Sequence, residues 1–244
     1  MANILAHRGP DDSGFYEDDL VSLGHRRLSI IDLSKQAQQP MSNEDKKIWL
    51  AVNGEIYNYK QLRQELIRAG HTFKSTSDSE VIVHAYEECG EDFVLRLEGM
   101  FACAIWDKNN GKLVLARDRL GIKPLYYSED SSQLIFSSEI KAILMNKDFH
   151  KEVNNDGLNQ YLAFQCILTN QTMFKGIFKL EPGHILVFKD GQKYKRSYWS
   201  IEDSISPLAQ EDILKTNLIS AVGSHLVSDV PLGVLLSGSI QAVS

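Results

Sequence analysis

The stretch Met100–Asp118 reads MFACAIWDKNNGKLVLARD, and it decides the fold class. Two apolar runs flank Asn110-Gly111, a dipeptide that strongly favours the tight turn of a β-hairpin. We therefore expect two antiparallel strands here. The segment LYYSEDSSQLIFSS (125–138) predicts another pair of strands, and GHILVFKDGQKYKRSYW (183–199) predicts a hairpin that turns at Asp190-Gly191.

Two helices are predicted ahead of this hairpin. Leu62, Leu66 and Ala69 have helical spacing, and Gly70 follows as a residue that ends helices. The segment SDSEVIVHAYEECG (77–90) predicts a second helix, capped by Ser77 or Asp78 and ended by Gly90.

The remaining elements complete an α+β pattern. Residues 20–33 predict a strand, a turn and a strand, and the strand in KKIWLAV is predicted to stop at the turn dipeptide Asn53-Gly54. Further helices are predicted over 139–145, 154–166 and 209–227. Many hairpins with a few helices indicate antiparallel sheets covered by helices.

Composition and charge exclude several classes of protein. The 244 residues allow one large domain, or one domain and part of another. A net charge of -6 without a basic block excludes nucleic acid or an anionic membrane as the expected partner. The apolar runs are too short to cross a bilayer, and no signal peptide precedes the first motif. We expect a cytoplasmic protein.

The three cysteines indicate neither a disulfide framework nor a zinc site. Cys89, Cys103 and Cys166 are scattered, odd in number and without CxxC spacing. We therefore expect no metal site in this chain. Cys89 and Cys103 are best interpreted as packing residues.

Polar residues cluster beside apolar strands, where structure alone does not call for polar side chains and a functional role is a candidate explanation. The clusters are Arg8/Asp11/Asp12, Arg26/Arg27, Asn53-Gly54-Glu55 and Asp78/Glu80. An amide and a glycine N–H can stabilise an oxyanion, an arginine can grip a carboxylate, and an aspartate can pair with an ammonium group. Together they could hold an α-amino acid by both of its charged ends.

Each piece alone has a plainer interpretation. Asn53-Gly54 is usually a turn. Arg26 and Arg27 are typical of a solvated strand end, and Asp78 of a helix cap. His84 on a helix is more often packed than catalytic, and Asp118-Arg119 is compatible with a structural ion pair.

The order of the motifs changes this balance. The segments HRGPDDSG, GHRRLSIIDLSKQAQQPM, NGEIYNY, SDSEVIVHAYEECG, LEGMFACAIWD, LARDRLGIKPLYY, FSSEIKAIL and LEPGHI occur in one series. This series resembles the glutaminase domain of glutamine-hydrolysing asparagine synthetases, a class II glutamine amidotransferase of the N-terminal-nucleophile type. The resemblance implies a four-layer αββα sandwich followed by an α/β, ATP-pyrophosphatase-like synthetase domain.

The resemblance also implies roles for the polar residues. Arg27 would grip the α-carboxylate of glutamine, and Leu28, Ser29, Ile30 and Ile31 would shape that wall. Asn53 and Gly54 would form the oxyanion hole. Glu55 and Asp78 would hold the α-ammonium group.

The nucleophile of this family is an N-terminal cysteine whose own α-amine serves as the base. Here Ala2 follows Met1, and MANILAHRGPD matches a segment inside family members. We therefore expect residues 1–200 to be an amidotransferase domain that lacks its first strand and its catalytic nucleophile. Cys89, Cys103 and Cys166 carry no free α-amine and would not replace it.

The end of the chain resembles the beginning of the synthetase domain. We expect residues 201–244 to form a linker helix and the first strand and loop of that domain. Ser237 and Gly238 match its ATP-phosphate loop, Leu235 would touch adenine, and Gln241 stands where an aspartate is usual. The complete enzyme would need ATP and Mg²⁺, whereas this chain would bind neither cofactor.

Three alternatives stay open at this point. The chain could be a glutamine-binding module without catalysis, a piece without function, or part of another class II amidotransferase with a different ammonia acceptor. Glutamine is the expected ligand of the binding module and of an amidotransferase, whichever acceptor takes the ammonia. The family is often dimeric, which leaves a homodimer as an alternative to a monomer.

Overall fold

A computed structural model describes residues 1–129, 133–202 and 211–233 of the protein. The residues predicted to contact ATP, Leu235, Ser237 and Gly238, lie outside this range. The elements in chain order are η1 (Ala2–Leu5), β1 (Asp12–Glu17), β2 (Ser22–Arg27), η2 (Lys35–Ala37), β3 (Met41–Ser42), β4 (Ile48–Ile56), α1 (Tyr59–Ala69), α2 (Glu80–Cys89), η3 (Gly90–Arg96), β5 (Gly99–Asp107), β6 (Lys112–Arg117), β7 (Tyr126–Glu129), β8 (Leu134–Ser137), α3 (Ile140–Ile143), α4 (Asn155–Phe164), β9 (Ile177–Lys179), β10 (His184–Lys189), β11 (Gln192–Ser197) and α5 (Glu211–Ser224).

The largest sheet is antiparallel and contains the strands predicted around Asn110-Gly111. Its strand order is β11-β10-β6-β5-β4-β3, with β5 and β6 joined so that Asp107 pairs with Lys112. Gly111 has a φ of +57°, which a glycine adopts without strain. The hairpin predictions at Asn110-Gly111 and Asp190-Gly191 and the strand pair within 125–138 are confirmed.

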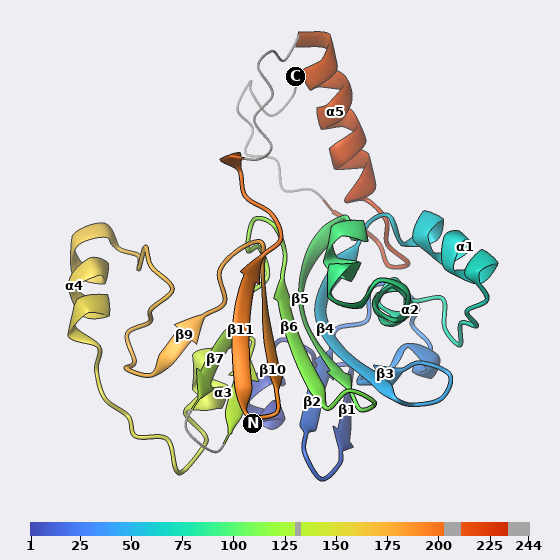
Figure 1. Cartoon of the computed structure of the whole chain (residues 1–244). Coiled ribbons are helices and arrows are strands. Elements are labelled where there is room, and N and C mark those ends of the chain that lie inside the picture. Colours follow the sequence, from blue (N-terminus) through green and yellow to red (C-terminus); the bar gives the residue numbers. More distant parts are fainter. Residues whose placement is uncertain (130–132, 203–210, 234–244) are drawn as a thin grey trace.

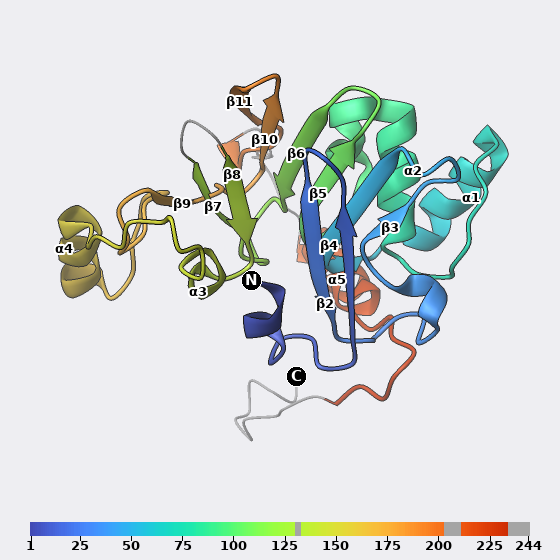
Figure 2. The same ribbon diagram turned by 90° about the horizontal axis from the view of Figure 1, so that it is seen from below.

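The central strands of the sheet are buried on both faces, and this explains why β5 is apolar from Met100 to Trp106. Phe101, Cys103 and Ile105 face a core shared with α1 and α2. Ala102 and Trp106, which alternate with them, face a second core shared with β2, β7 and the segment before β10. Figures 1 and 2 show α1 and α2 together on one face of the large sheet.

The second core is covered by two smaller groups of strands. One is the β1–β2 hairpin, and the other is a sheet with the order β8-β7-β9. Figure 2 shows the β1–β2 hairpin lying across β4 and β5. No helix in the described residues is long and apolar enough to cross a membrane.

The helix predictions are confirmed by the described helices α1 to α5. Helix α1 ends at Gly70, which has a φ of +109°. Helix α2 also ends at its predicted glycine, Gly90. Its predicted cap is wrong, because Ser79 precedes the helix and no side chain caps it.

The predicted arrangement of residues 20–33 is partly wrong. Only β2 is a strand there, and its partner β1 comes from the HRGPDDSG segment, which had the composition of a loop. Residues 28–34 curl because the guanidinium of Arg27 donates to the backbone carbonyls of Ile31, Asp32 and Ser34.

The turn predicted at Asn53-Gly54 is also wrong, because β4 runs through both residues to Ile56. A Cβ atom on residue 54 would lie 2.1 Å from the carbonyl oxygen of Met100 and 2.6 Å from the Cα of Phe101. The glycine therefore permits β5 to approach closely. A glycine needed for close strand packing and a glycine needed for a turn look the same in the sequence.

Asp118 organises the loop that follows β6. Its side chain is 1% exposed, and its carboxylate accepts hydrogen bonds from the backbone N–H groups of four residues. These are Phe101, Leu120, Ile122 and Lys123, at 2.9–3.2 Å. The carboxylate therefore serves backbone donors and is not the partner of Arg119 in an ion pair, as the sequence suggested.

Replacing Asp118→Asn should lower the free energy of unfolding by roughly 2 to 4 kcal/mol, because the amide would turn an N–H group toward buried donors. Urea denaturation at neutral pH measures this. Arg119→Gln is the matched control and should change stability by less than about 0.5 kcal/mol. Equal losses in both variants would instead favour the ion pair.

Candidate functional site

A pocket of about 250 Å³ lies where β2 and β4 meet the loop before α2. It brings together residues that are far apart in the chain. Of the residues predicted to bind glutamine, those lining it are Arg27, Leu28, Ile30, Ile31, Asn53, Gly54, Glu55 and Asp78. Ser29 is not among the lining residues, and its backbone N–H donates to a carboxylate oxygen of Asp11 at 2.8 Å.

The pocket is built on an open edge of β4. Strand β3 pairs with β4 only at Trp49 and Leu50. Beyond that point, side chains take the place of a neighbouring strand. The backbone N–H of Val52 donates to Oε1 of Gln39 at 2.7 Å, and the N–H of Ile56 donates to Oδ2 of Asp78 at 2.8 Å.

The N–H group of Gly54 points to this same open edge. Its partner in β5 is Phe101, whose own N–H and C=O groups are both bonded to Asp118. Gly54 and Phe101 therefore form the kind of antiparallel pair in which the two residues exchange no hydrogen bonds. The N–H groups of alternate residues in a strand point to the same edge. The N–H of Gly54 therefore points to the same open edge as the N–H groups of Val52 and Ile56, and lies between them.

Asn53 provides a second donor. Its side-chain nitrogen Nδ2 is buried and has no hydrogen-bond partner among the described residues. A buried donor without a partner destabilises the folded protein, and such a donor is often satisfied by a bound ligand, ion or water. The amide of Asn53 and the N–H of Gly54 are thus two donors on adjacent residues of one pocket wall, as an oxyanion requires.

Two carboxylates lie on the same wall. Asp78 is only 4% exposed, and it binds the backbone of β4 rather than capping α2. Burial, together with the nearby charge of Glu55, raises the pKa of Asp78 to about 6. A positively charged group in the pocket would therefore be stabilised by these two carboxylates and would favour the ionised form of Asp78.

Arg27 is 7% exposed and uses part of its bonding capacity internally. A guanidinium has five N–H donors. Three of them hold the carbonyls of the 28–34 loop, and the Nε–H and one Nη1–H remain without a partner among the described residues. The arginine therefore shapes the pocket wall and keeps two donors for an anionic ligand.

Some pocket residues had no role predicted from the sequence. His25 contacts the backbone carbonyl of Val52 through Nε2 at 3.0 Å, and burial lowers its pKa to about 4. It is therefore neutral at pH 7, and Nε2 donates. Gln39, described above, is only 6% exposed. The one available signal for His25 was its place directly before Arg26-Arg27.

None of the three cysteines, all of which the structure describes, lines the pocket. Cys103 is buried on the helix side of β5, and burial raises the pKa of its thiol to about 12. Cys89 is partly buried, and Cys166 is exposed. The pocket thus has the groups to recognise an amino acid without a thiol to attack it.

Comparison with known proteins agrees with the geometry. A glutamine amidotransferase domain family matches residues 1–199. The chain is 38% identical over 248 residues to "Asparagine synthetase [glutamine-hydrolyzing] 1" of Bacillus subtilis (strain 168), a match that covers 99% of this chain and 39% of that protein. It is 41% identical over 260 residues to asparagine synthetase 2 of the same organism, covering 100% of this chain and 34% of that protein.

A solved structure described as "Structure of the allosteric regulatory enzyme of purine biosynthesis" has a TM-score of 0.50 at 20% identity, over 73% of this chain and 35% of that chain. This likeness concerns the fold alone. The chain spans between 34% and 39% of the length of the two synthetases above. The family resemblance seen in the motif series is confirmed: the chain belongs to the glutamine amidotransferase domain family and is homologous to the glutaminase part of glutamine-hydrolysing asparagine synthetases.

Proposed function

We propose that the pocket binds L-glutamine by its two charged ends and its side-chain amide. The observation that carries this proposal is that the unpartnered side-chain amide of Asn53 and the N–H of Gly54, which points away from β5, lie on one wall with two carboxylates. In a protein that also carries a nucleophile and a synthetase domain, such a pocket would release ammonia for the ATP-dependent amidation of aspartate to asparagine.

Each group has one task in this proposal. The two remaining N–H donors of Arg27 bind the α-carboxylate, because an arginine matches the planar geometry of that anion. Glu55 and Asp78 bind the α-ammonium group. Asn53 and Gly54 donate to the amide oxygen. Leu28, Ser29, Ile30 and Ile31 form the adjoining wall.

The attacking group in a hydrolysing member of this family would be the thiol of an N-terminal cysteine. Its α-amine would take the thiol proton, the sulfur would add to the amide carbon of glutamine, and the negative oxygen would be held by Asn53 and Gly54 while the same proton passes to the leaving nitrogen. Loss of ammonia would leave a thioester, and water would then release glutamate and restore the thiol. No cysteine of this chain lines the pocket, so this chain would bind without hydrolysis.

The finer features of the fold belong to the same proposal. The described layers are a pair of helices, the large sheet and a second layer of strands, and α3 contacts β7 and β8 on that second layer. A four-layer αββα sandwich with its first strand missing would extend this arrangement. Residues 201–244 would begin the synthetase domain, whose ATP and Mg²⁺ enter no step proposed here.

A second candidate is a glutamine-binding module without catalytic activity. The absence of a thiol from the residues lining the pocket favours this function for the chain as it stands. Both candidates require glutamine binding, and they differ in whether a longer protein supplies the nucleophile.

Isothermal titration calorimetry with L-glutamine tests the pocket directly. We expect binding to the wild-type chain and at least a tenfold loss of affinity in Arg27→Ala, because a charge-assisted pair and the wall it supports are both removed. Arg68→Ala removes one exposed positive charge from α1 and serves as the control. Absence of binding, or equal losses in both variants, would contradict the proposal.

Glutamine affinity should depend on pH through Asp78. Its pKa of about 6 means that the carboxyl group is mainly protonated at pH 5 and mainly ionised at pH 7. If the ammonium group of glutamine needs the ionised form, affinity should be about tenfold weaker at pH 5 than at pH 7. Titrations at both pH values measure the ratio, and in Asp78→Asn binding should be weaker and the ratio should approach one.

Ammonia release from L-glutamine by the chain should equal the rate without protein. A coupled assay with glutamate dehydrogenase measures this release. Enzyme-like turnover that disappears in Cys89→Ala, Cys103→Ala or Cys166→Ala would show that an internal thiol acts as nucleophile, and the mechanism proposed above would then be wrong.

A further inference from the structure

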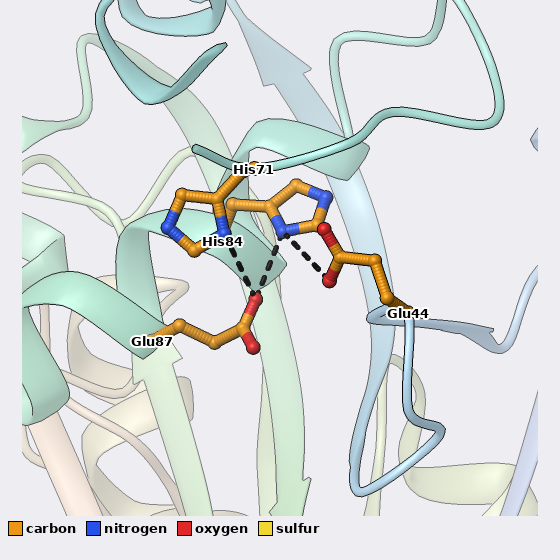
Figure 3. Close-up of side chains that lie close together, drawn as sticks. All are labelled: Glu44, His71, His84 and Glu87. Atoms are coloured by element: carbon orange, nitrogen blue, oxygen red, sulfur yellow. Dashed lines mark hydrogen bonds and ion pairs between the residues drawn. The ribbon is translucent and has the colours of Figure 1, made fainter. Parts of the chain in front are cut away.

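A second group of polar residues lies outside the glutamine pocket. It consists of His71, His84, Glu44 and Glu87, none of which lines the pocket (Figure 3). Three segments supply them: the turn between β3 and β4, the segment after α1, and helix α2, where His84 and Glu87 are almost one turn apart. Each residue offers one ligand atom, and these atoms all lie within 4.8 Å of one another.

The distances within this cluster suit a small tetrahedral cation. Nδ1 of His84 lies 2.9 Å from Oε2 of Glu87 and 3.8 Å from Oε2 of Glu44. Nδ1 of His71 lies 3.5 Å from the same oxygen of Glu87. Bonds of about 2.0–2.1 Å at tetrahedral angles around Zn²⁺ separate ligand atoms by about 3.3–3.4 Å, so small movements would complete the geometry.

The other nitrogen of each histidine faces a further carboxylate. Nε2 of His71 lies 2.9 Å from Oε1 of Glu88. His84 is 1% exposed, and its Nε2 is 3.9 Å from Oε1 of Glu80, without a hydrogen-bond partner among the described residues. Histidines that bind metals typically donate their second N–H to a carboxylate, which fixes the ring and its tautomer.

The two carboxylates of the cluster are held in a matching way. Oε1 of Glu87 accepts from Nδ2 of Asn43 at 2.7 Å, and Oε1 of Glu44 accepts from the backbone N–H of Thr72 at 2.7 Å. Each carboxylate therefore has one oxygen fixed by the protein and the other directed at His84. Supporting hydrogen bonds to three of the four ligands, and a carboxylate facing the fourth, distinguish a built site from a chance meeting of charges.

The excess of negative charge in the cluster also favours a bound cation. Glu44, Glu80, Glu87 and Glu88 surround two imidazoles, which are uncharged when they act as metal ligands. A divalent cation would offset half of this negative charge at the centre of the cluster. Nitrogen and oxygen donors in a four-coordinate arrangement suit Zn²⁺ better than Ca²⁺ or Mg²⁺, which prefer six or more oxygen ligands.

We propose that His71, His84, Glu44 and Glu87 bind one divalent transition-metal ion, with Zn²⁺ as the best fit. The ion would join the β3–β4 turn, the segment after α1 and helix α2, and would therefore have a structural role. The competing explanation is a cluster of ion pairs with protonated histidines, which would take up no metal.

Metal binding to the whole chain tests this site without any assay of activity. Chelator-treated protein is titrated with ZnCl₂ at pH 7 by calorimetry, and bound metal is counted after dialysis by mass spectrometry. We expect one Zn²⁺ per chain, and a visible absorption typical of four-coordinate Co²⁺ when CoCl₂ replaces ZnCl₂.

Variants locate the ion. Glu44→Gln keeps an acceptor for Thr72 but removes the ligand charge, and His71→Ala removes a nitrogen ligand. Each should raise the dissociation constant for Zn²⁺ at least tenfold, whereas His150→Ala, an exposed histidine elsewhere, should leave it unchanged. Binding of less than one Zn²⁺ per wild-type chain, or unchanged binding in Glu44→Gln, would overturn the proposal. Because Glu44 is exposed, we expect this variant to fold, and circular dichroism checks this.

Discussion

The pocket depends on the fact that β4 continues beyond the end of β3. A strand edge without a neighbour leaves backbone donors that must find acceptors. Gln39 and Asp78 supply these acceptors at Val52 and Ile56, and the interaction buries the Asp78 carboxyl group beside Glu55. The contact thus satisfies the sheet edge and buries Asp78, and this burial raises the pKa of its carboxyl group, although the hydrogen bond from Ile56 itself lowers it.

A second constraint acts from the opposite side of β4. Asp118 hydrogen-bonds to both the N–H and the C=O group of Phe101. These two groups are therefore not available to Gly54, and this determines which backbone groups of β4 point toward β5. This arrangement directs the N–H of Gly54 away from β5, and the missing side chain of Gly54 allows the two strands to approach. The direction of the Gly54 N–H, away from β5, is therefore a consequence of strand register, and a one-residue shift would reverse it.

Local signals predicted local structure well. The turns at Asn110-Gly111 and Asp190-Gly191 are set by two adjacent residues, so a sequence pattern is sufficient. Asn53-Gly54 has similar turn chemistry but forms a strand, because the contact with Phe101 that decides it is distant in the chain. The grouping of Arg27, Asn53 and Asp78 was predicted with the help of the family resemblance. His25 and Gln39 bind the backbone of Val52 at the open edge of β4, and the spacing of residues in the sequence does not predict such a contact. The ligands of the proposed metal site likewise come from three segments, and cysteine spacing carried no information about them.

Helix α2 connects the two sites through Glu80. Its carboxylate accepts the backbone N–H groups of Lys74 and Ser75, and this fixes the loop that carries Asp78 to Ile56. One of its oxygens also lies 3.9 Å from Nε2 of His84. A buried carboxylate needs compensation for its lost hydration, and here it comes from the backbone N–H groups of Lys74 and Ser75 and the hydroxyl of Ser75. Glu80 therefore contacts both the loop that carries Asp78 and the histidine cluster.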